Sequence, residues 1–300
     1  MAGKTIIDLI GNTPLVPLRG MRRRGMAKVL LKLESHNPTG SLKDRIVKYI
    51  LEAAERDGTL RPGHTIIDAS SGNTGIALSV VAAVKGYQVR IYMPETKSIE
   101  RRRIMQVLGT EVVLTSGADQ NSHIWACQEA ARDTERFFYL NQNGNQGNCE
   151  AHYHGTAKEI VKQTRGRVDC FVAGAGTGGT LVGVARYMRD HGIGTRIVSV
   201  EPDSPKSKIE GLLHFDGSFV PPIWDPSVID QQRRVSDDVA FATARELARK
   251  EGVFSGPSSG AILAVALEQA RELGPGKTVV ALICDRGERY LSTRLVGDLG

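Results

Sequence analysis

Short β-rich runs alternate with longer amphipathic stretches along the whole chain, and this alternation constrains the fold most strongly. The short runs predict strands at residues 29–33, 65–68, 89–92, 111–114, 170–173, 197–200 and 278–283. The amphipathic stretches predict helices at residues 43–56, 74–85, 99–108, 119–135, 178–190, 237–251 and 259–273. Strands that alternate with helices at this spacing form parallel sheets through right-handed crossovers. We therefore predict an α/β fold.

The 300 residues are enough for one large domain or two smaller ones. An Asn/Gly-rich stretch at residues 141–148 is the best candidate for a division. We expect an N-terminal α/β domain of residues 1–145 and a C-terminal α/β domain of residues 146–300. Ligands of such folds bind beyond the carboxyl ends of the strands, so the loops that follow the strands should carry the chemistry.

Composition excludes several classes of function. The net charge is +6, but the basic runs at 22–24 and 101–103 are short and only 5% of residues are aromatic, which favours an anionic small molecule over nucleic acid. No apolar run is long enough to cross a bilayer, and residues 1–8 lack a signal-peptide core. The four cysteines have no CxxC spacing. We expect a cytoplasmic protein with reduced thiols, no membrane contact and no metal site.

Lys43 lies just after a Pro/Gly turn, in the first turn of a predicted helix. Ser41 is a suitable N-cap, and Asp44 follows three positions later, as in a capping box. The positive end of the helix macrodipole disfavours an ammonium there and so favours a nucleophilic amine. The alternative is a solvated surface lysine, the commoner role of a lone lysine.

Three loops add to this picture. Residues 69–75 are rich in small hydroxyl and amide groups before a helix, which suits a carboxylate, although a capped turn has the same composition. Residues 174–180 are glycine-rich and suit a phosphate, without the Gly-Lys-Ser/Thr ending of an NTPase loop. Residues 254–261 place serines at another helix start. An amine, a carboxylate loop, a phosphate loop and a serine loop together suit pyridoxal phosphate (PLP).

The glycine loop leaves a second cofactor open. Gly174, Gly176 and Gly179 also satisfy the spacing of a dinucleotide fingerprint, and Glu201 lies roughly where a ribose-binding acid would. A nicotinamide-dependent oxidoreductase would leave Lys43 and the 69–75 loop unexplained.

Longer motifs occur in the order IGNTPL (10–15), KLE (32–34), NPTGSLKDR (37–45), SGNTGIAL (71–78), GTGGT (176–180), VEP (200–202), SSG (258–260) and ICDRGERYLST (283–293). In this order they resemble the cysteine synthases (O-acetylserine sulfhydrylases), especially the B isoform, of the fold-type II PLP enzymes. The resemblance covers nearly the whole chain. It implies a tryptophan synthase β-like fold: two parallel-sheet α/β domains with the cofactor in the cleft between them, and roughly residues 1–35 crossing to the other domain.

The resemblance also implies roles for individual residues. Lys43 matches the Schiff-base lysine, Asn73 the partner of the cofactor's ring hydroxyl, and Ser258 the serine on the pyridine nitrogen. The phosphate cup is matched by Gly176, Thr177, Gly178, Gly179 and Thr180. The grip on the substrate carboxylate is matched by Ser70, Ser71, Gly72, Thr74 and Gln142.

The implied reaction is β-replacement on O-acetylserine with sulfide, giving cysteine and acetate. A neutral hydroxyl at Ser258 supports an unprotonated pyridine, which favours prompt loss of the β-leaving group. Cys284 and Arg286 resemble the B isoform, which is associated with thiosulfate and S-sulfocysteine, and they are candidates for a sulfur-donor site. Cys284 could equally be a buried core thiol. The resemblance further implies a homodimer and a possible serine acetyltransferase C-terminal tail as partner.

Some positions depart from the family pattern. Asn143 stands where phenylalanine is common, Ala157 and Lys158 replace a Gly-Pro pair, and Ser70 replaces a common threonine. Other PLP reactions on this fold therefore stay open: cystathionine β-synthase, phosphoserine sulfhydrylase and threonine dehydratase. Residues 206–220 contain only two cations, both lysines, and so offer little to pair with a phosphoserine phosphate. A non-catalytic protein that binds a peptide tail is a third alternative.

Overall fold

The computed structural model describes residues 4–70, 72–97, 99–119, 121–216 and 219–297. The chain divides into two compact units. Unit 1 comprises Met1–Ile10 and Asn37–Asn148, and unit 2 comprises Gly11–His36 and Cys149–Gly300. Each unit contains a sheet with helices, which confirms the α/β fold predicted from the alternating pattern.

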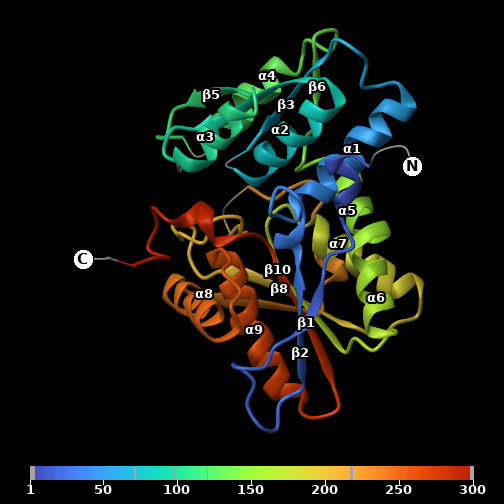
Figure 1. The fold of residues 1–300 in the computed structure, drawn as a ribbon, viewed down its shortest axis with the longest axis vertical. Coiled ribbons are helices and arrows are strands. Elements are labelled where there is room, and N and C mark those ends of the chain that lie inside the picture. Colours follow the sequence, from blue (N-terminus) through green and yellow to red (C-terminus); the bar gives the residue numbers. More distant parts are fainter. Residues whose placement is uncertain (1–3, 71, 98, 120, 217–218, 298–300) are drawn as a thin grey trace. The chain divides into compact units, whose positions relative to one another are not determined.

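Unit 1 has a parallel sheet in the order β5–β4–β3–β6 (Figure 1). Its strands are β3 (Thr65–Ala69), β4 (Gln88–Pro94), β5 (Glu111–Thr115) and β6 (Phe137–Tyr139). Its helices are α1 (Lys43–Asp57), α2 (Asn73–Lys85), α3 (Ile99–Val107), α4 (Ser122–Ala130) and the short 3-10 helix η1 (Ile6–Leu9). Helices α2 and α4 both pack on β3 and β4, so these central strands are buried and read as apolar runs.

Unit 2 has a mixed sheet in the order β1–β2–β10–β7–β8–β9, in which the pair β1–β2 is antiparallel and the other pairs are parallel. Its strands are β1 (Leu15–Pro17), β2 (Lys28–Leu33), β7 (Cys170–Gly174), β8 (Arg196–Pro202), β9 (Gln231–Val235) and β10 (Thr278–Ile283). Its helices include α6 (Lys158–Thr164), α7 (Gly179–Asp190), α8 (Asp237–Glu251) and α9 (Pro257–Leu273). Residues 11–36 lie in this unit because β2 pairs with β10 along its whole length.

Short elements complete the two units. Helix α5 (Gly147–Ala151) starts at the boundary of the units and runs into the π-helix η3 (His152–Ala157), which continues as α6. The 3-10 helices η2 (Glu34–His36), η4 (Pro226–Val228) and η5 (Gly287–Tyr290) belong to unit 2. Helices α8 and α9 lie side by side, and α9 packs on β7 and β10 (Figure 1).

Several elements differ from the sequence prediction. Strands β1, β6 and β9 and the run from α5 to α6 were not predicted, and α4 is shorter than the expected 119–135. β1 and β6 span three residues each, and β9 is a polar edge strand, so none carries a strong apolar pattern. Glycines at 147 and 155 obscure the helical pattern before α6.

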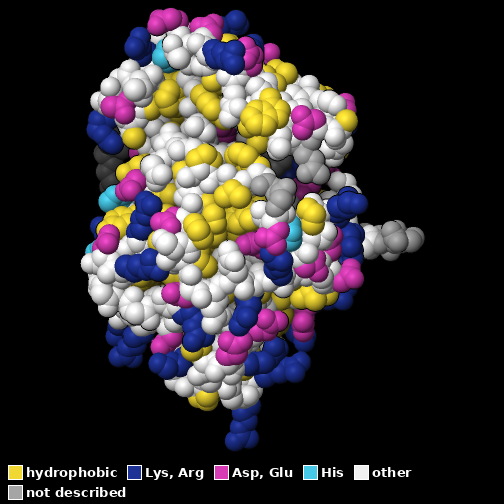
Figure 2. Space-filling view, turned by 180° about the vertical axis from the view of Figure 1, so that it is seen from behind, with side chains coloured by type: hydrophobic (Ala, Val, Ile, Leu, Met, Phe, Trp, Pro, Cys, Tyr) yellow, Lys and Arg dark blue, Asp and Glu magenta, His cyan; other side chains and the backbone are white. Residues whose placement is uncertain are grey.

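The surface charge and the length and hydropathy of the helices are relevant to nucleic-acid and membrane binding. Figure 2 shows Lys and Arg side chains interspersed with Asp and Glu over one face, without a continuous basic stripe there. None of the helices in the described part of the chain combines the length and hydropathy needed to span a membrane. The four cysteines are buried thiols.

Candidate functional site

Each of the two sheets has a point at which its strand order reverses, and within each unit a candidate ligand loop follows the strand at that point. In unit 1 the order runs from β3 outward to β5, whereas β6 adds on the other side of β3. In unit 2 the order runs from β7 outward to β9, whereas β10 adds on the other side of β7. Open α/β sheets bind ligands at such switch points, beyond the carboxyl ends of the strands. The 70–74 loop follows β3, and the 174–180 loop follows β7.

The loop after β3 is organised by its own hydroxyl groups. Ser70 is buried, and its Oγ accepts hydrogen bonds from the N–H groups of Gly72 and Gly75, each at 3.1 Å. This ties the end of β3 to the first turn of α2, where Asn73 is half-buried. A Cβ on Gly72 would come within 2.3 Å of the Arg101 side chain, so any larger residue would have to displace Arg101. Ser71 lies outside the described residues.

Gln142 joins the same loop from the segment that follows β6. Its Nε2 donates to the carbonyl of Ala69 at 3.0 Å, and its Oε1 accepts from Thr74 Oγ1 at 2.6 Å. The Gln142 carbonyl accepts a hydrogen bond from Asn148 Nδ2 at 2.8 Å. The structure thus brings together the substrate-loop residues Ser70, Gly72, Thr74 and Gln142, as the resemblance implies.

Lys43 is the first residue of α1 and is half-buried. The expected capping box does not form, because the N-cap of the helix is Leu42 rather than Ser41. Ser41 Oγ accepts from the Lys43 N–H at 3.3 Å, and the Asp44 carboxylate accepts from the N–H and hydroxyl of Thr39. These bonds fix the turn that precedes Lys43, so the lysine side chain leaves a rigid helix start.

The glycine loop after β7 opens helix α7, whose first N–H groups form an anion site. Gly178 has a φ of +90°, and a Cβ there would lie 2.7 Å from the indole of Trp224. A Cβ on Gly176 would lie 2.5 Å from the Gly211 carbonyl oxygen. Both glycines are therefore required for the main chain to pass close to its neighbours.

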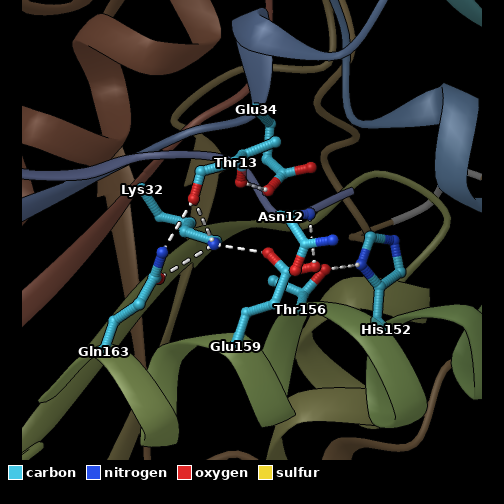
Figure 3. Close-up of polar contacts among 8 residues, drawn as sticks. All are labelled: Asn12, Thr13, Lys32, Glu34, His152, Thr156, Glu159 and Gln163. Carbon is cyan, nitrogen blue, oxygen red and sulfur yellow. Dashed lines mark hydrogen bonds and ion pairs between the residues drawn. The ribbon is translucent and has the colours of Figure 1, made fainter. Parts of the chain in front are cut away.

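A buried histidine, His152, supports this loop, and Figure 3 shows its contact with Thr156. His152 is fully buried in the π-helix η3, with its Nε2 3.1 Å from Thr180 Oγ1 and its Nδ1 2.9 Å from Thr156 Oγ1. The imidazole thus ties the first turn of α7 to η3. π-helical turns frequently mark functional sites. His152 was not singled out from the sequence, where a lone histidine beside Tyr153 carries no motif.

A second buried cluster, around Lys32, anchors the segment of residues 11–36 in unit 2. Lys32 is fully buried, and its Nζ donates to Glu159 Oε2 at 2.6 Å, to Gln163 Oε1 at 3.0 Å and to the Thr13 carbonyl at 2.8 Å (Figure 3). Thr13 Oγ1 donates to Glu34 Oε1 at 2.7 Å. The ammonium therefore has three acceptors, as a buried cation requires. This cluster ties β2 and the segment that precedes β1 to α6.

Ser258 lies in the first turn of α9 and is 3% exposed. Its neighbour Ser259 accepts the Cys284 N–H at 3.0 Å, so the end of β10 is fixed against the start of α9. Cys284 is buried, whereas Arg286 is exposed and its Nε donates to the Ser35 carbonyl at 2.9 Å. Ser258, the glycine loop, Cys284 and Arg286 all belong to unit 2 and lie at or next to the carboxyl ends of β7 and β10.

Comparisons with known proteins agree with this geometry. Residues 6–285 match the family model described as "Pyridoxal-phosphate dependent enzyme". The chain belongs to this family. "Cysteine synthase B" of Pseudomonas aeruginosa is 41% identical over 289 residues, which are 96% of this chain and 96% of that protein.

Solved structures of relatives have the same fold. O-ureido-L-serine synthase has a TM-score of 0.94 at 38% identity and covers 100% of this chain and 97% of its own. Cysteine synthase (OASS) from Entamoeba histolytica has a TM-score of 0.91 at 37% identity and covers 98% and 91%. The PLP-family enzyme described here is thus of the cysteine synthase type, with a fold-type II architecture, and the nicotinamide alternative for the 174–180 glycines is wrong.

The residues present fit PLP. The N–H groups at the start of α7, beside glycines whose Cβ would clash, can hold a phosphate. A half-buried lysine and a buried serine at two further helix starts supply an amine and a neutral hydroxyl. No group of three or more His, Cys, Asp or Glu side chains that could hold a metal occurs in the described part of the chain.

Proposed function

We propose that the protein catalyses β-replacement on O-acetylserine with sulfide, giving cysteine and acetate. The observation that carries this is the pairing, within unit 1, of an amine at a helix start with a hydroxyl- and amide-rich carboxylate loop at the switch point of the sheet. The relatives named cysteine synthase over nearly the whole chain support the choice of reaction.

In this proposal Lys43 would hold the cofactor covalently through its side-chain amine, and the same amine, when free, would remove the α-proton of the substrate. Bound PLP supplies the electron-withdrawing ring that makes this proton acidic and lets the acetate leave. Ser70, Ser71, Gly72 and Thr74 form the loop that binds the substrate carboxylate. Gln142 fixes Thr74 and thereby the orientation of the loop. The carboxylate grip holds the α-proton within reach of the Lys43 amine.

The remaining roles concern the cofactor. Gly176, Thr177, Gly178, Gly179 and Thr180 bind the phosphate, with His152 holding Thr180 in place. Asn73 donates to the ring hydroxyl. Ser258 would offer the pyridine nitrogen a neutral hydroxyl, which would support an unprotonated ring and favour loss of the leaving group.

The test is covalent mapping of the cofactor together with turnover. We expect borohydride reduction of the yellow protein to place the cofactor mass on the peptide that contains Lys43. Lys43→Ala should remove this label and lower cysteine formation by several orders of magnitude. Lys48→Ala on the same helix, whose Nζ donates to the Ile7 carbonyl, is the matched control and should keep both. A label on another lysine would refute the assignment, and turnover of O-phosphoserine or of serine with homocysteine in place of O-acetylserine would refute the reaction.

The sulfur donor is a separate part of the proposal. Arg286 carries an exposed guanidinium next to the end of β10, and the chain has a net charge of +6, so an anionic donor such as thiosulfate would be attracted. We expect S-sulfocysteine from thiosulfate, detected by product mass, and a lower rate with thiosulfate but not with sulfide in Arg286→Gln. Cysteine from sulfide without any S-sulfocysteine at saturating thiosulfate would assign Cys284 and Arg286 to packing alone.

Cellular context follows from the resemblance alone. We propose a cytoplasmic homodimer whose substrate loop can bind the C-terminal tail of a serine acetyltransferase. Light scattering coupled to size-exclusion chromatography tests the dimer. Competition between such a peptide and O-acetylserine tests the second interaction, and a peptide without effect on the KM would contradict it.

A further inference from the structure

The segment that follows β10 contains two buried residues to which the proposed reaction assigns no role. Asp285 is fully buried, and Tyr290, the last residue of η5, is 2% exposed. The Tyr290 hydroxyl donates a hydrogen bond to Asp285 Oδ2 at 2.6 Å. A buried hydrogen bond is costly to break, because the separated groups would have neither each other nor water. The pair is therefore a rigid part of unit 2.

The pair lies against the residue that precedes α9. A Cβ on Gly256 would come within 2.5 Å of both Asp285 Oδ1 and the Tyr290 ring, so the pair packs directly on the Gly256 main chain. Gly256 is the N-cap of α9 and, as a glycine, makes no side-chain capping hydrogen bond. The position of the first turn of α9 therefore depends on the groups that pack against it from outside the helix.

Further contacts join the same two segments, residues 254–259 and residues 284–290. The Cys284 N–H donates to Ser259 Oγ at 3.0 Å, the Gly287 N–H donates to the Phe254 carbonyl at 3.2 Å, and Ser255 and Arg286 form an antiparallel β-bridge. Residues 284–290 thus hold the start of α9 on both sides of Ser258, which lies in its first turn.

The ring of Tyr290 fixes the pair from the other side. It belongs to a buried cluster with Phe241 and Ala244 of α8 and with Leu295. Tyr290 therefore links α8 to the start of α9, because α8 holds its ring and its hydroxyl holds Asp285 against Gly256. Removal of the hydroxyl alone would leave the ring in its cluster and release Asp285.

We propose that Tyr290 is a positioning residue that acts through Asp285 on the start of α9, and so holds Ser258 in the orientation in which its hydroxyl meets the pyridine nitrogen of PLP. A hydroxyl bonds a ring nitrogen only over a narrow range of distance and angle, so a small shift of the first turn would weaken that bond. The inference rests on the role proposed above for Ser258.

The test is a double-mutant cycle on the full-length protein, read as the dissociation constant of PLP in equilibrium dialysis. We expect Tyr290→Phe to weaken PLP binding about fivefold when Ser258 is present. In a Ser258→Ala background it should weaken binding by less than about twofold, because the hydrogen bond that Tyr290 protects is then already absent. Tyr153→Phe is the matched control and should leave the constant unchanged, since the Tyr153 hydroxyl donates to the exposed Asp190 at 2.9 Å in the same unit.

A second measurement uses the protein without its cofactor. Hydrogen exchange of a peptide that covers residues 254–263 should be faster in Tyr290→Phe than in the wild type and in Tyr153→Phe. Gly256→Ala should have the same effect while it keeps every hydroxyl, because its Cβ would displace the Asp285–Tyr290 pair.

Equal losses of PLP affinity in the two backgrounds would show that Tyr290 does not act through Ser258, and would overturn the proposal. So would unchanged exchange at residues 254–263, or an unchanged affinity in Tyr290→Phe when Ser258→Ala weakens binding. If Ser258→Ala itself leaves the affinity unchanged, the role of Ser258 is refuted and this inference with it. A protein that shows the expected coupling but forms no cysteine would refute the proposed reaction alone.

Discussion

Replacing Asp68 by asparagine should make the protein more stable at alkaline pH, and the gain should grow as the pH rises from 5 to 8. Burial raises the pKa of this carboxyl from 3.8 to about 7 in the folded state. Because the folded pKa lies above the unfolded one, the folded state binds more protons between these values, and stability falls as the pH rises through this window. The cost is absent below about pH 4 and fully present above about pH 7, where a shift of about three pKa units corresponds to about 4 kcal/mol.

Asparagine removes this pH dependence but brings an NH2 group that needs a partner, which costs about 1–3 kcal/mol at every pH. The difference in stability between Asp68→Asn and the wild type should therefore increase by about 3 kcal/mol from pH 5 to pH 8, whatever the constant cost of the amide. Scanning calorimetry of both proteins over this range measures it, and a change in the Tm difference on the order of 5–10 °C is expected. Other titrating groups cancel in the difference. A Tm difference that is constant with pH would refute the reasoning.

Three further changes probe the other parts of the site. Ser258→Asp should keep the cofactor but slow cysteine formation, because a carboxylate raises the proton affinity of the pyridine nitrogen, and an unchanged kcat would contradict the proposed role of Ser258. Gly178→Ala should weaken cofactor binding at least tenfold in equilibrium dialysis, since its Cβ would meet Trp224, whereas Gly192→Ala, also at positive φ but without a neighbour within 4 Å, should not. Lys32→Met should lower the stability in urea by about 3–5 kcal/mol by leaving Glu159 without its buried partner, and Lys277→Met, at the exposed pair with Asp169, by less than about 1 kcal/mol. Equal losses in the two lysine variants would show that burial of the pair is not decisive.

The central strands could be predicted because their signal is local. Residues 279–283 form an uninterrupted apolar run, as is typical of a parallel strand covered on both faces, and the structure gives β10 (Thr278–Ile283) the predicted bounds. Strand β9 escaped prediction because Gln-Gln-Arg-Arg-Val lies at the edge of its sheet, where one side is solvated and no apolar run is needed. The loops, like the central strands, have a local sequence signal, whereas the residues that support the loops have none. The 70–74 and 174–180 loops follow strands whose carboxyl ends could be located from the sequence.

The supporting residues could not be found in this way. His152 meets Thr180, and Gln163 meets the Thr13 carbonyl, across long stretches of sequence. Each is a lone polar residue with no motif around it, and its role depends on the strand order, which sequence periodicity does not specify. The helix start at Lys43 shows a smaller failure of local reasoning. Ser41 and Asp44 have the spacing of a capping box. In the structure, however, the N-cap is Leu42, and the Asp44 carboxylate accepts a hydrogen bond from Thr39 instead.

The two tryptophans are distributed one to each unit. Trp125 lies on α4 of unit 1 and is 54% exposed, whereas Trp224 of unit 2 packs its ring 4.9 Å from that of Phe215 and lies against Gly178. Their fluorescence should therefore separate, with red-shifted, acrylamide-sensitive emission from Trp125 and shielded emission from Trp224. Each half of the chain thus contains its own optical reporter, and that of unit 2 lies beside the loop proposed to hold the phosphate. Without any added label, the unfolding of the two halves and the filling of the glycine loop can be followed as separate signals in one cuvette.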